Sequence, residues 1–354
     1  MLTIMIPTMN RSEFLIRQLE YYAAAGYPYE VAVADSSNEQ HRRNIEDAVG
    51  RLKGRLKVTY HHLPGISDYV CLKHLVDTAS TKYAVYCGDD DFFVVPGLLK
   101  AVDFLEHNSS YSAVNGRSVL VVSQEPGPAA KLTALGPYPQ RALEDDTASQ
   151  RLLRYTKNYF TSIFAVQRIE RWRRMYAQVH TVSDRQLGGE TLPCSLCAIL
   201  GKIKHLDNLY LVRQAHDNRY LLLDLFDWVT KHDWASSYQI VHDILVENLM
   251  REDGLEKPAA HEVVKQALWS HWQQAMSSQY KQRYGKSVLE QAKDLLKGSE
   301  FLRRTLVPKL RQLKAKLRVK KEISLAAFLN PQSPYHEDFM PIYKKINSAE
   351  VCAP

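Results

Sequence analysis

The chain has 354 residues, of which 45% are hydrophobic, and a formal net charge of +7. Its length suggests two domains, or one large domain with an appendage. The positive charge is concentrated in residues 301–321, which hold nine Lys or Arg and no acidic residue. The composition therefore excludes a general nucleic-acid-binding body, and no nucleic acid is expected as a partner.

The sequence shows no signal for export or membrane insertion. Its first residues form too short an apolar run, without a basic start, to act as a signal peptide. No stretch reaches the about 18 apolar residues of a membrane span. Three of the five cysteines lie in apolar runs, which fits a reducing compartment better than a disulfide framework. We therefore expect a cytoplasmic protein.

Short apolar runs alternate with helix-like segments through the first third of the chain. The expected strands cover residues 2–8, 29–37, 55–65, 82–88 and 111–122. The expected helices cover residues 11–26, 38–54, 67–80 and 96–108. This alternation predicts βαβ units, a mostly parallel sheet and an α/β fold.

The later part of the chain has a different pattern. Residues 123–140 are rich in Pro, Gly and small side chains, so we expect a loop or hairpin insertion. From residue 221 onward the pattern is mostly helical, with segments at 221–249, 261–284 and 287–321.

Polar clusters follow three of the expected parallel strands, at residues 7–11, 35–38 and 88–91. Ligands bind such sheets beyond the carboxyl ends of the strands, so these clusters are expected to converge on one site. The third cluster contains three adjacent carboxylates, Asp89, Asp90 and Asp91. In an extended chain Asp89 and Asp91 point to one side, where they suit a hard divalent cation, and Asp90 points to the other. The alternative is a solvated acidic turn that caps the next helix.

The order of these features resembles the nucleotide-sugar-binding half of a family 2 glycosyltransferase with the GT-A fold. The resemblance covers residues 2–108 and rests on IPTMNR, on the acid that ends the second strand, and on YAVYCGDDDFF. The Asp cluster corresponds to the DxD motif of such enzymes. Residues up to about 220 resemble the acceptor half less specifically. The resemblance implies a GT-A, Rossmann-like catalytic domain with a mainly α-helical C-terminal region.

The resemblance also implies roles at the first two strand ends. Pro7, Thr8 and Arg11 match the loop that contacts the nucleotide. Asp35 and Ser36 match the place where an acid reads the base, typically uracil. The alternative for Asp35 is a residue that only forms an Asx turn.

In the Asp cluster, the resemblance places Asp89 near the ribose and the metal. Asp90 belongs to the nucleotide-sugar site, and Asp91 holds a Mn²⁺ or Mg²⁺ ion bound to the diphosphate. A divalent cation suits this chemistry because it neutralises the charge of the leaving diphosphate. Asp90 is the one expected to tolerate replacement by Asn best.

A catalytic base is expected within residues 182–202, because the attacking hydroxyl must lose a proton. The resembled fold places this carboxylate just before an apolar helix, and Glu190 follows two glycines there. The helix dipole would favour its ionised form. Asp184 is the second candidate, and the alternative for Glu190 is a helix cap without a catalytic role.

An apolar strand runs into Arg213, His216 and Arg219. In the resembled fold a His near this point completes the metal shell, and basic residues clamp the diphosphate. Arg213 and Arg219 are therefore candidate donor contacts, since Arg suits phosphate by its planar fork. His216 is a candidate metal ligand. The alternative is a surface turn.

Residues 301–321 combine leucines at helical spacing with Lys and Arg on the other faces. This pattern is typical of a basic amphipathic helix that lies on an anionic membrane surface, here the inner face of the cell membrane. Pro308 argues for a kink or a break. The alternative is that the leucines pack internally.

Together these features predict a metal-dependent, inverting glycosyltransferase of the hexosyltransferase type. Its donor is expected to be a nucleotide-diphosphate sugar, UDP-linked, and its acceptor a glycan or lipid-linked molecule in polysaccharide or glycoconjugate assembly. The expected domains are 1–220, divided at 118 into donor and acceptor halves, and 221–354. The alternatives are a nucleotidyltransferase, although no glycine lies in the loop after the first strand, and a non-catalytic membrane-surface module.

Overall fold

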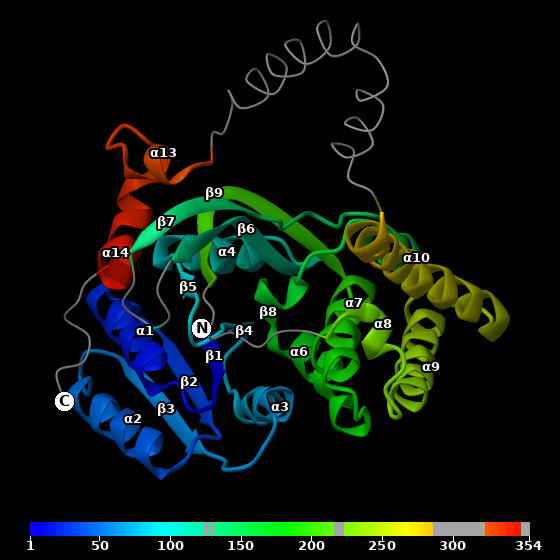
Figure 1. Ribbon diagram of the computed structural model, residues 1–354, viewed down its shortest axis with the longest axis horizontal. Helices are drawn as coiled ribbons and strands as arrows, with labels where there is room; N and C mark the ends of the chain where they lie inside the picture. The colour runs from blue at the N-terminus through cyan, green and yellow to red at the C-terminus, as the bar shows by residue number, and fades with distance from the viewer. Residues whose placement is uncertain (124–126, 128–130, 216–222, 286–322, 348–354) are drawn as a thin grey trace, which may run out of the picture.

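The computed structural model describes residues 1–123, 127, 131–215, 223–285 and 323–347 (Figure 1). The first half of its sheet is parallel, in the order β3-β2-β1-β4. These strands are β1 (Leu2–Thr8), β2 (Glu30–Asp35), β3 (Lys57–His62) and β4 (Tyr83–Tyr86). β1 is buried along its whole length, which explains its almost wholly apolar sequence. The predicted α/β class is confirmed.

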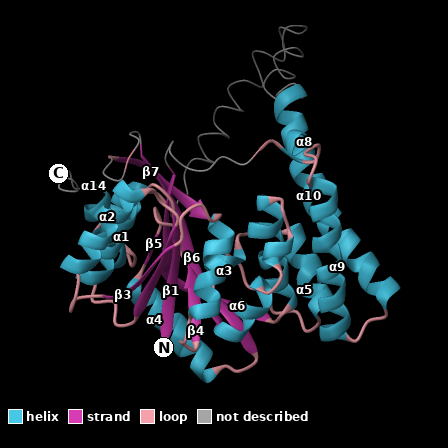
Figure 2. Cartoon of the chain, turned by 90° about the horizontal axis from the view of Figure 1, so that it is seen from below, coloured by secondary structure: helices cyan, strands magenta, loops and turns pink. Residues whose placement is uncertain are grey.

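Helices cover both faces of this half of the sheet. They are α1 (Ser12–Ala24), α2 (Glu39–Arg51), α3 (Asp68–Thr78) and α4 (Val95–His107). The first two and α4 share one apolar core, whereas α3 belongs to the core on the opposite face. Figure 2 shows α1 and α2 on one side of the strands and α3 on the other.

The second half of the sheet is mixed. Its long strands, β6 (Tyr111–Ser123) and β9 (Lys202–Ala215), pair in parallel. The three-residue β8 (Val166–Arg168) joins β6 to β4 and is antiparallel to both. The edge strand β5 (Phe92–Phe93) pairs with β9. β7 (Leu132–Tyr138) is antiparallel to β6. The sequence analysis expected either a loop or a hairpin at residues 123–140, and this antiparallel pairing is that of a hairpin.

A group of helices lies on the side of the sheet that α3 covers. Its members are α5 (Ala148–Lys157), α6 (Ile169–Tyr176), α7 (Leu192–Ile199), α8 (Leu225–Trp228), α9 (Trp234–Asp253) and α10 (Lys257–Tyr284). α9 and α10 pack on the outside of this group. Buried tryptophans, including Trp172, Trp228 and Trp272, fill the core between them. In the described part of the chain, no helix has the length and apolar character to cross a membrane.

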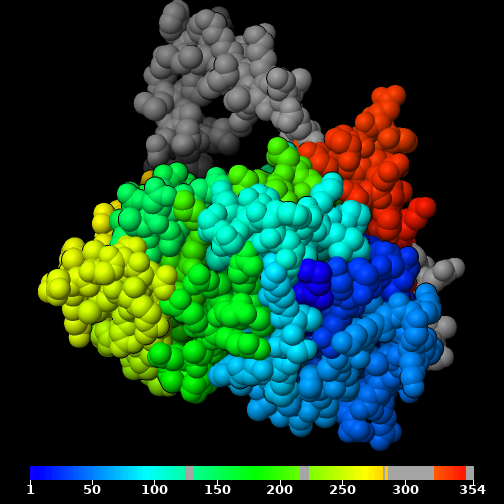
Figure 3. Space-filling view, turned by 180° about the vertical axis from the view of Figure 1, so that it is seen from behind, coloured from blue at the N-terminus to red at the C-terminus, as the bar shows by residue number. Residues whose placement is uncertain are grey.

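The last described segment returns to the first half of the sheet. Helices α13 (Leu325–Leu329) and α14 (His336–Asn347) share the core of α1 and α4, and Phe328 and Phe339 are fully buried there. Figures 1 and 3 show this red segment beside the blue N-terminal part, far from the yellow helices α9 and α10. We therefore group α13 and α14 with the sheet, although the sequence analysis placed them with the helical region 221–354.

Candidate active site

The loops after β1 and β2 are joined by hydrogen bonds, because the two parallel strands are neighbours and end at the same edge of the sheet. The backbone N–H of Asn10 donates to Ser37 Oγ at 2.6 Å, and the N–H of Asn38 donates to Asn10 Oδ1 at 2.9 Å. Asn10 has φ 54°, a left-handed conformation that Asn tolerates better than most residues. The two loops therefore form one fixed rim at the carboxyl end of the sheet.

Asp89, Asp90 and Asp91, which we call the aspartate turn, lie in a turn because β4 ends before them. The predicted alternation of an extended chain is therefore wrong here. Asp89 and Asp90 both face Arg11, whose Nη1 lies 3.1 Å from Asp89 Oδ1 and whose Nη2 lies 2.8 Å from Asp90 Oδ2. Asp91 faces Arg213 instead.

Asp89 and Asp90 are the more accessible part of the aspartate turn. Thr8 Oγ1 donates a hydrogen bond of 2.8 Å to Asp89 Oδ2. Burial raises the pKa of Asp89 to about 7, although Arg11 acts against this shift. The Asp90 side chain is 12% exposed and that of Arg11 is 21% exposed. Two carboxylates thus converge on one cationic group that solvent can reach.

Asp91 has no exposed surface. Its Oδ2 accepts a hydrogen bond from Arg213 Nε at 2.8 Å, and its Oδ1 accepts one from the N–H of Gln214 at 3.2 Å. Burial raises the pKa of Asp91 to about 6, against the attraction of Arg213. The guanidinium carbon of Arg213 also lies 4.8 Å from the ring centres of Tyr138 and Phe164. Asp91 and the two rings therefore fix the position of Arg213.

Close packing under the aspartate turn requires glycine at position 88. A Cβ atom on Gly88 would lie 2.9 Å from Asp90 Oδ1 and 3.2 Å from Asp91 Oδ2. Gln18 of α1 supports the turn, because its Nε2 donates to the carbonyl oxygen of Gly88 at 2.8 Å and to that of Asp91 at 2.5 Å.

Asp35 is fully buried at the end of β2 and already accepts two hydrogen bonds. The Tyr60 hydroxyl donates to Oδ2 at 2.6 Å, and the N–H of Ser37 donates to Oδ1 at 2.8 Å. The second bond is the Asx turn that was the alternative expectation. The neighbouring Ser36 donates its N–H to the carbonyl oxygen of Thr8 at 3.0 Å.

Asp184 is buried and accepts hydrogen bonds from four residues. The backbone N–H groups of Gln186 and Leu187 donate to Oδ1 at 3.0 and 2.9 Å, and Trp228 Nε1 donates at 3.0 Å. Lys231 Nζ lies 2.8 Å from Oδ2. Burial opposes ionisation, but these donors lower the pKa of Asp184 overall. The carboxylate is therefore ionised and held in place by the loop, α8 and the residues that follow α8.

Glu190 lies in a π-helical turn, Leu187–Thr191, that leads into α7. The Tyr159 hydroxyl donates a hydrogen bond to its Oε1. Glu190 lines a cavity of about 140 Å³. The other residues around this cavity include Pro7, Tyr86, Phe164, Arg185 and Arg213. The structure thus brings Glu190 together with the predicted donor contacts Pro7 and Arg213.

Tyr159 is a site residue that the sequence analysis missed. It follows α5 in the segment KNYFTS, which contains no motif or periodicity that marks a site. Its hydroxyl reaches Glu190 because α5 packs against α7, the helix that continues from the turn carrying Glu190. Two predicted residues, His216 and Arg219, lie outside the described residues.

Comparisons with known proteins bear on the fold. No family model matches the chain, and no curated protein matches it. Residues 1–349 of S. aureus TarS, in complex with UDP-GlcNAc, match 82% of this chain and 77% of that chain at 16% identity, with a TM-score of 0.50. The fold is that of a GT-A glycosyltransferase. The architecture expected from the sequence is thereby confirmed, and at this identity the likeness shows the fold alone.

Two further solved structures match less well. Another structure of TarS 1–349 matches at 15% identity with a TM-score of 0.48, covering 82% of this chain and 76% of that chain. The mannosyltransferase PcManGT from Pyrobaculum calidifontis, in complex with GDP-Man and Mn²⁺, matches at 14% identity with a TM-score of 0.40. It covers 97% of this chain and 84% of that chain.

The aspartate turn can hold a divalent cation if Asp89 and Asp90 are its protein ligands and substrate phosphates complete its coordination. Within the described residues no group of three His, Cys, Asp or Glu forms a complete metal site. Mg²⁺, however, is commonly held by one or two carboxylates and completed by substrate phosphates. Asp89 and Asp90 offer such a pair, since their oxygens already converge on one cation. Asp91 is less suitable, because it has no exposed surface, whereas Asp89 and Asp90 are both partly exposed.

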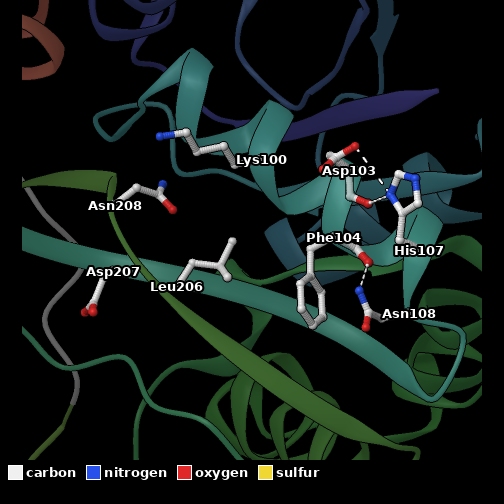
Figure 4. Close-up of a pocket in the computed structure, with 8 residues that line it drawn as sticks. All are labelled: Lys100, Asp103, Phe104, His107, Asn108, Leu206, Asp207 and Asn208. Carbon is white, nitrogen blue, oxygen red and sulfur yellow. Dashed lines mark hydrogen bonds and ion pairs between the residues drawn. The ribbon is translucent and has the colours of Figure 1, made fainter.

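A larger hollow of about 510 Å³ lies elsewhere, between α4 and β9. Figure 4 shows Asp103 and His107 pointing toward each other on α4, with His107 Nδ1 3.5 Å from Asp103 Oδ1. Asn208 and its neighbours on β9 form the opposite wall. The residues around this hollow include no member of the aspartate turn and no partner of Glu190, so its size does not make it the candidate site.

Proposed function

We propose that this chain is an inverting glycosyltransferase that moves a hexosyl group from a UDP-linked sugar to a glycan or lipid-linked acceptor. One observation carries the proposal: Glu190 and Arg213 line the same cavity, and Asp91 of the aspartate turn holds Arg213. A candidate base and a candidate diphosphate contact therefore share one space on a GT-A fold. The UDP-GlcNAc bound by the TarS fragment supports UDP as the nucleotide.

Glu190 is the proposed catalytic base. The acceptor hydroxyl must lose a proton as its oxygen attacks the sugar, and a carboxylate within reach provides the acceptor for that proton. Tyr159 occupies Oε1, and among the described residues Oε2 has no hydrogen-bond partner. Asp184, the second candidate, is proposed instead to fix the loop, because donors from four residues already surround it.

Arg11 and Arg213 are proposed to bind the diphosphate of the donor. Each guanidinium group is held by carboxylates of the aspartate turn, and its planar fork suits phosphate oxygens. A Mn²⁺ or Mg²⁺ ion held by Asp89 and Asp90, in place of the Arg11 guanidinium that they bind in this structure, would neutralise the charge of the departing diphosphate. We therefore move the proposed metal contact from Asp91 to Asp90, and propose that Asp91 positions Arg213.

Thr8, Asp35 and Ser36 remain the proposed nucleotide contacts on the fixed rim. Asp35 is fully buried and accepts two hydrogen bonds, so its contact with a base N–H stays a prediction from the sequence, although a carboxylate offers about four lone-pair sites. The roles expected for His216, Arg219 and residues 301–321 at the metal, the diphosphate and an anionic membrane stay predictions, because these residues lie outside the described ones.

Donor turnover by the wild-type chain tests the proposal. UDP-GlcNAc and UDP-glucose are incubated with the protein, with and without Mn²⁺, and release of UDP is followed. We expect UDP release that Mn²⁺ increases and that Glu190→Gln reduces about 10²- to 10⁴-fold. The matched control is Glu170→Gln on the exposed side of α6, which should leave the rate unchanged.

Two other outcomes would overturn this function. Release of pyrophosphate from nucleoside triphosphates in place of UDP would identify a nucleotidyltransferase. If calorimetry detects no binding of any nucleoside diphosphate or nucleotide sugar with Mn²⁺ present, the glycosyltransferase proposal fails and the non-catalytic module becomes the better account.

A further inference from the structure

Tyr159 connects the candidate base to the C-terminal helical region. Its hydroxyl donates to Glu190 Oε1. Its ring lies against the imidazole of His271 on α10, with ring centres 4.4 Å apart and planes inclined by 32°. The Tyr155 ring of α5 lies 5.3 Å from it. The phenol is therefore in contact with rings of two helices while its hydroxyl reaches the π-helical turn.

We infer that Tyr159 is a positioning residue for the base and that His271 holds Tyr159 in place, so that helix α10 takes part in catalysis. The inference rests on the proposed function, in which Glu190 removes the acceptor proton. A glutamate side chain has three rotatable bonds, and a bond to Oε1 restricts them. That bond leaves Oε2 as the oxygen that receives the proton.

The chemical state of both supporting residues fits this role. Burial is the main cause that raises the pKa of Tyr159 well above its ordinary value, so the hydroxyl keeps its proton and acts as a donor. Burial lowers the pKa of His271, although the nearby carbonyl oxygen of Thr156 acts against it, so a neutral ring packs on the phenol. Neither group competes with Glu190 for the acceptor proton at neutral pH.

Several other titratable or charged groups line the same cavity as Glu190 or interact with it electrostatically. They are Tyr138 of β7, Tyr155 of α5, Tyr176 of α6, Cys194 of α7, Asp68 of α3, Arg213 of β9 and Arg185 of the preceding loop. Among the described residues, the hydrogen bond to Glu190 comes from Tyr159 alone. Removal of that one hydroxyl therefore isolates its effect.

The test compares Tyr159→Phe with the wild type. The substitution keeps the ring and removes the donor, so kcat should fall roughly 10- to 100-fold while KM for the UDP-sugar stays within about twofold. The acidic limb of the kcat/KM profile should move to higher pH, because a lost donor disfavours the ionised carboxylate. His271→Leu should also lower kcat and move the acidic limb to higher pH, but by smaller amounts. The double variant should have the same kcat as Tyr159→Phe, because both changes act through one hydrogen bond.

Tyr155→Phe is the matched control. It removes a buried hydroxyl from the same stack, one that donates to the carbonyl oxygen of Phe160 at 2.9 Å and does not touch Glu190. It should lower the unfolding temperature and leave kcat and the acidic limb unchanged. If Tyr159→Phe does not fold, His271→Leu carries the same test with the hydroxyl still present.

Three outcomes would overturn the inference, and they separate it from the proposed function. In an active wild type, an unchanged kcat and acidic limb in Tyr159→Phe would remove the positioning role alone. The same pH shift in Tyr155→Phe would assign the effect to packing and not to the hydrogen bond. A wild type that turns over no UDP-sugar would remove the base, and with it both proposals.

Discussion

The aspartate turn and the loop that carries Asp184 and Glu190 are both acidic, but their partners are distributed differently. Each carboxylate of the aspartate turn faces an arginine. In the loop, Asp184 has donors from four residues, whereas Glu190 accepts one hydrogen bond from a phenol. Buried charges persist only when they are paired. The fully paired carboxylates therefore shape the site, and the sparsely paired one is the carboxylate that we propose for proton transfer.

The strongest test of this difference is to neutralise Asp184 and Glu190 in separate variants. Glu190→Gln should reduce turnover by about 10²- to 10⁴-fold and leave the unfolding temperature within about 2 °C, because one hydrogen bond at most is altered. Asp184→Asn should instead lower the free energy of unfolding by roughly 1–3 kcal/mol, because Lys231 loses the nearer of its carboxylate partners and keeps Asp233 at 3.4 Å. Turnover of the folded fraction should change little.

UDP release and urea denaturation of both variants measure this contrast. A large loss of turnover in Asp184→Asn at unchanged stability would identify Asp184, and not Glu190, as the catalytic base.

The next largest effect is a difference in stability between variants of Asp91 and Asp90. Asp91→Ala leaves Arg213 without its buried carboxylate, so the free energy of unfolding should fall by about 3 kcal/mol. Asp90→Ala should cost less than half of that, because Arg11 remains paired with Asp89. Urea denaturation measures both losses, and equal losses would show that accessibility does not distinguish these acids.

The smallest effect concerns the pH dependence of stability. Burial raises the pKa of Asp89 to about 7 in the folded chain, above the value of about 3.9 in an unfolded one. The folded state therefore binds this proton more tightly, and the contribution of Asp89 to the free energy of unfolding falls as pH rises from about 4 to about 7. Asp89→Asn should make the decline between pH 5 and 7 shallower, by at most about 1.4 kcal/mol per pH unit.

Denaturation at pH 5, 6 and 7 compares the two slopes. Parallel slopes would mean that Arg11 keeps Asp89 ionised throughout this range.

The first half of the fold is predictable because its signals are local. β1, β2 and β3 are each followed directly by a helix, and β4 is followed by the aspartate turn, β5 and then α4. This order determines which strand ends meet. The fastening of Asn10 to Ser37 and Asn38 is a direct consequence of that order. The position of Glu190 just before an apolar helix is also predictable, because two glycines mark a turn there in the sequence itself, whereas its role stays a prediction.

The remaining features depend on contacts between distant residues. The three residues of β8 are too few to show periodicity, yet they join the two halves of the sheet. The direction of each carboxylate in the aspartate turn depends on where β4 ends and on Arg213, which lies 122 residues later than Asp91. Tyr159 reaches Glu190 through the packing of α5 on α7, which no local pattern records.

Helix α14 packs on α1, and Lys345 Nζ pairs with Glu20 at 2.5 Å across 325 residues of chain. At a synthesis rate of roughly 5–20 residues per second, α1 leaves the ribosome roughly 15–65 s before α14. Phe339 and Ile342 then complete the core that Leu15 and Leu19 began. Until α14 has been made, the nascent chain exposes apolar surface that is buried in the folded protein. Aggregation is therefore a greater hazard during translation than in the folded state.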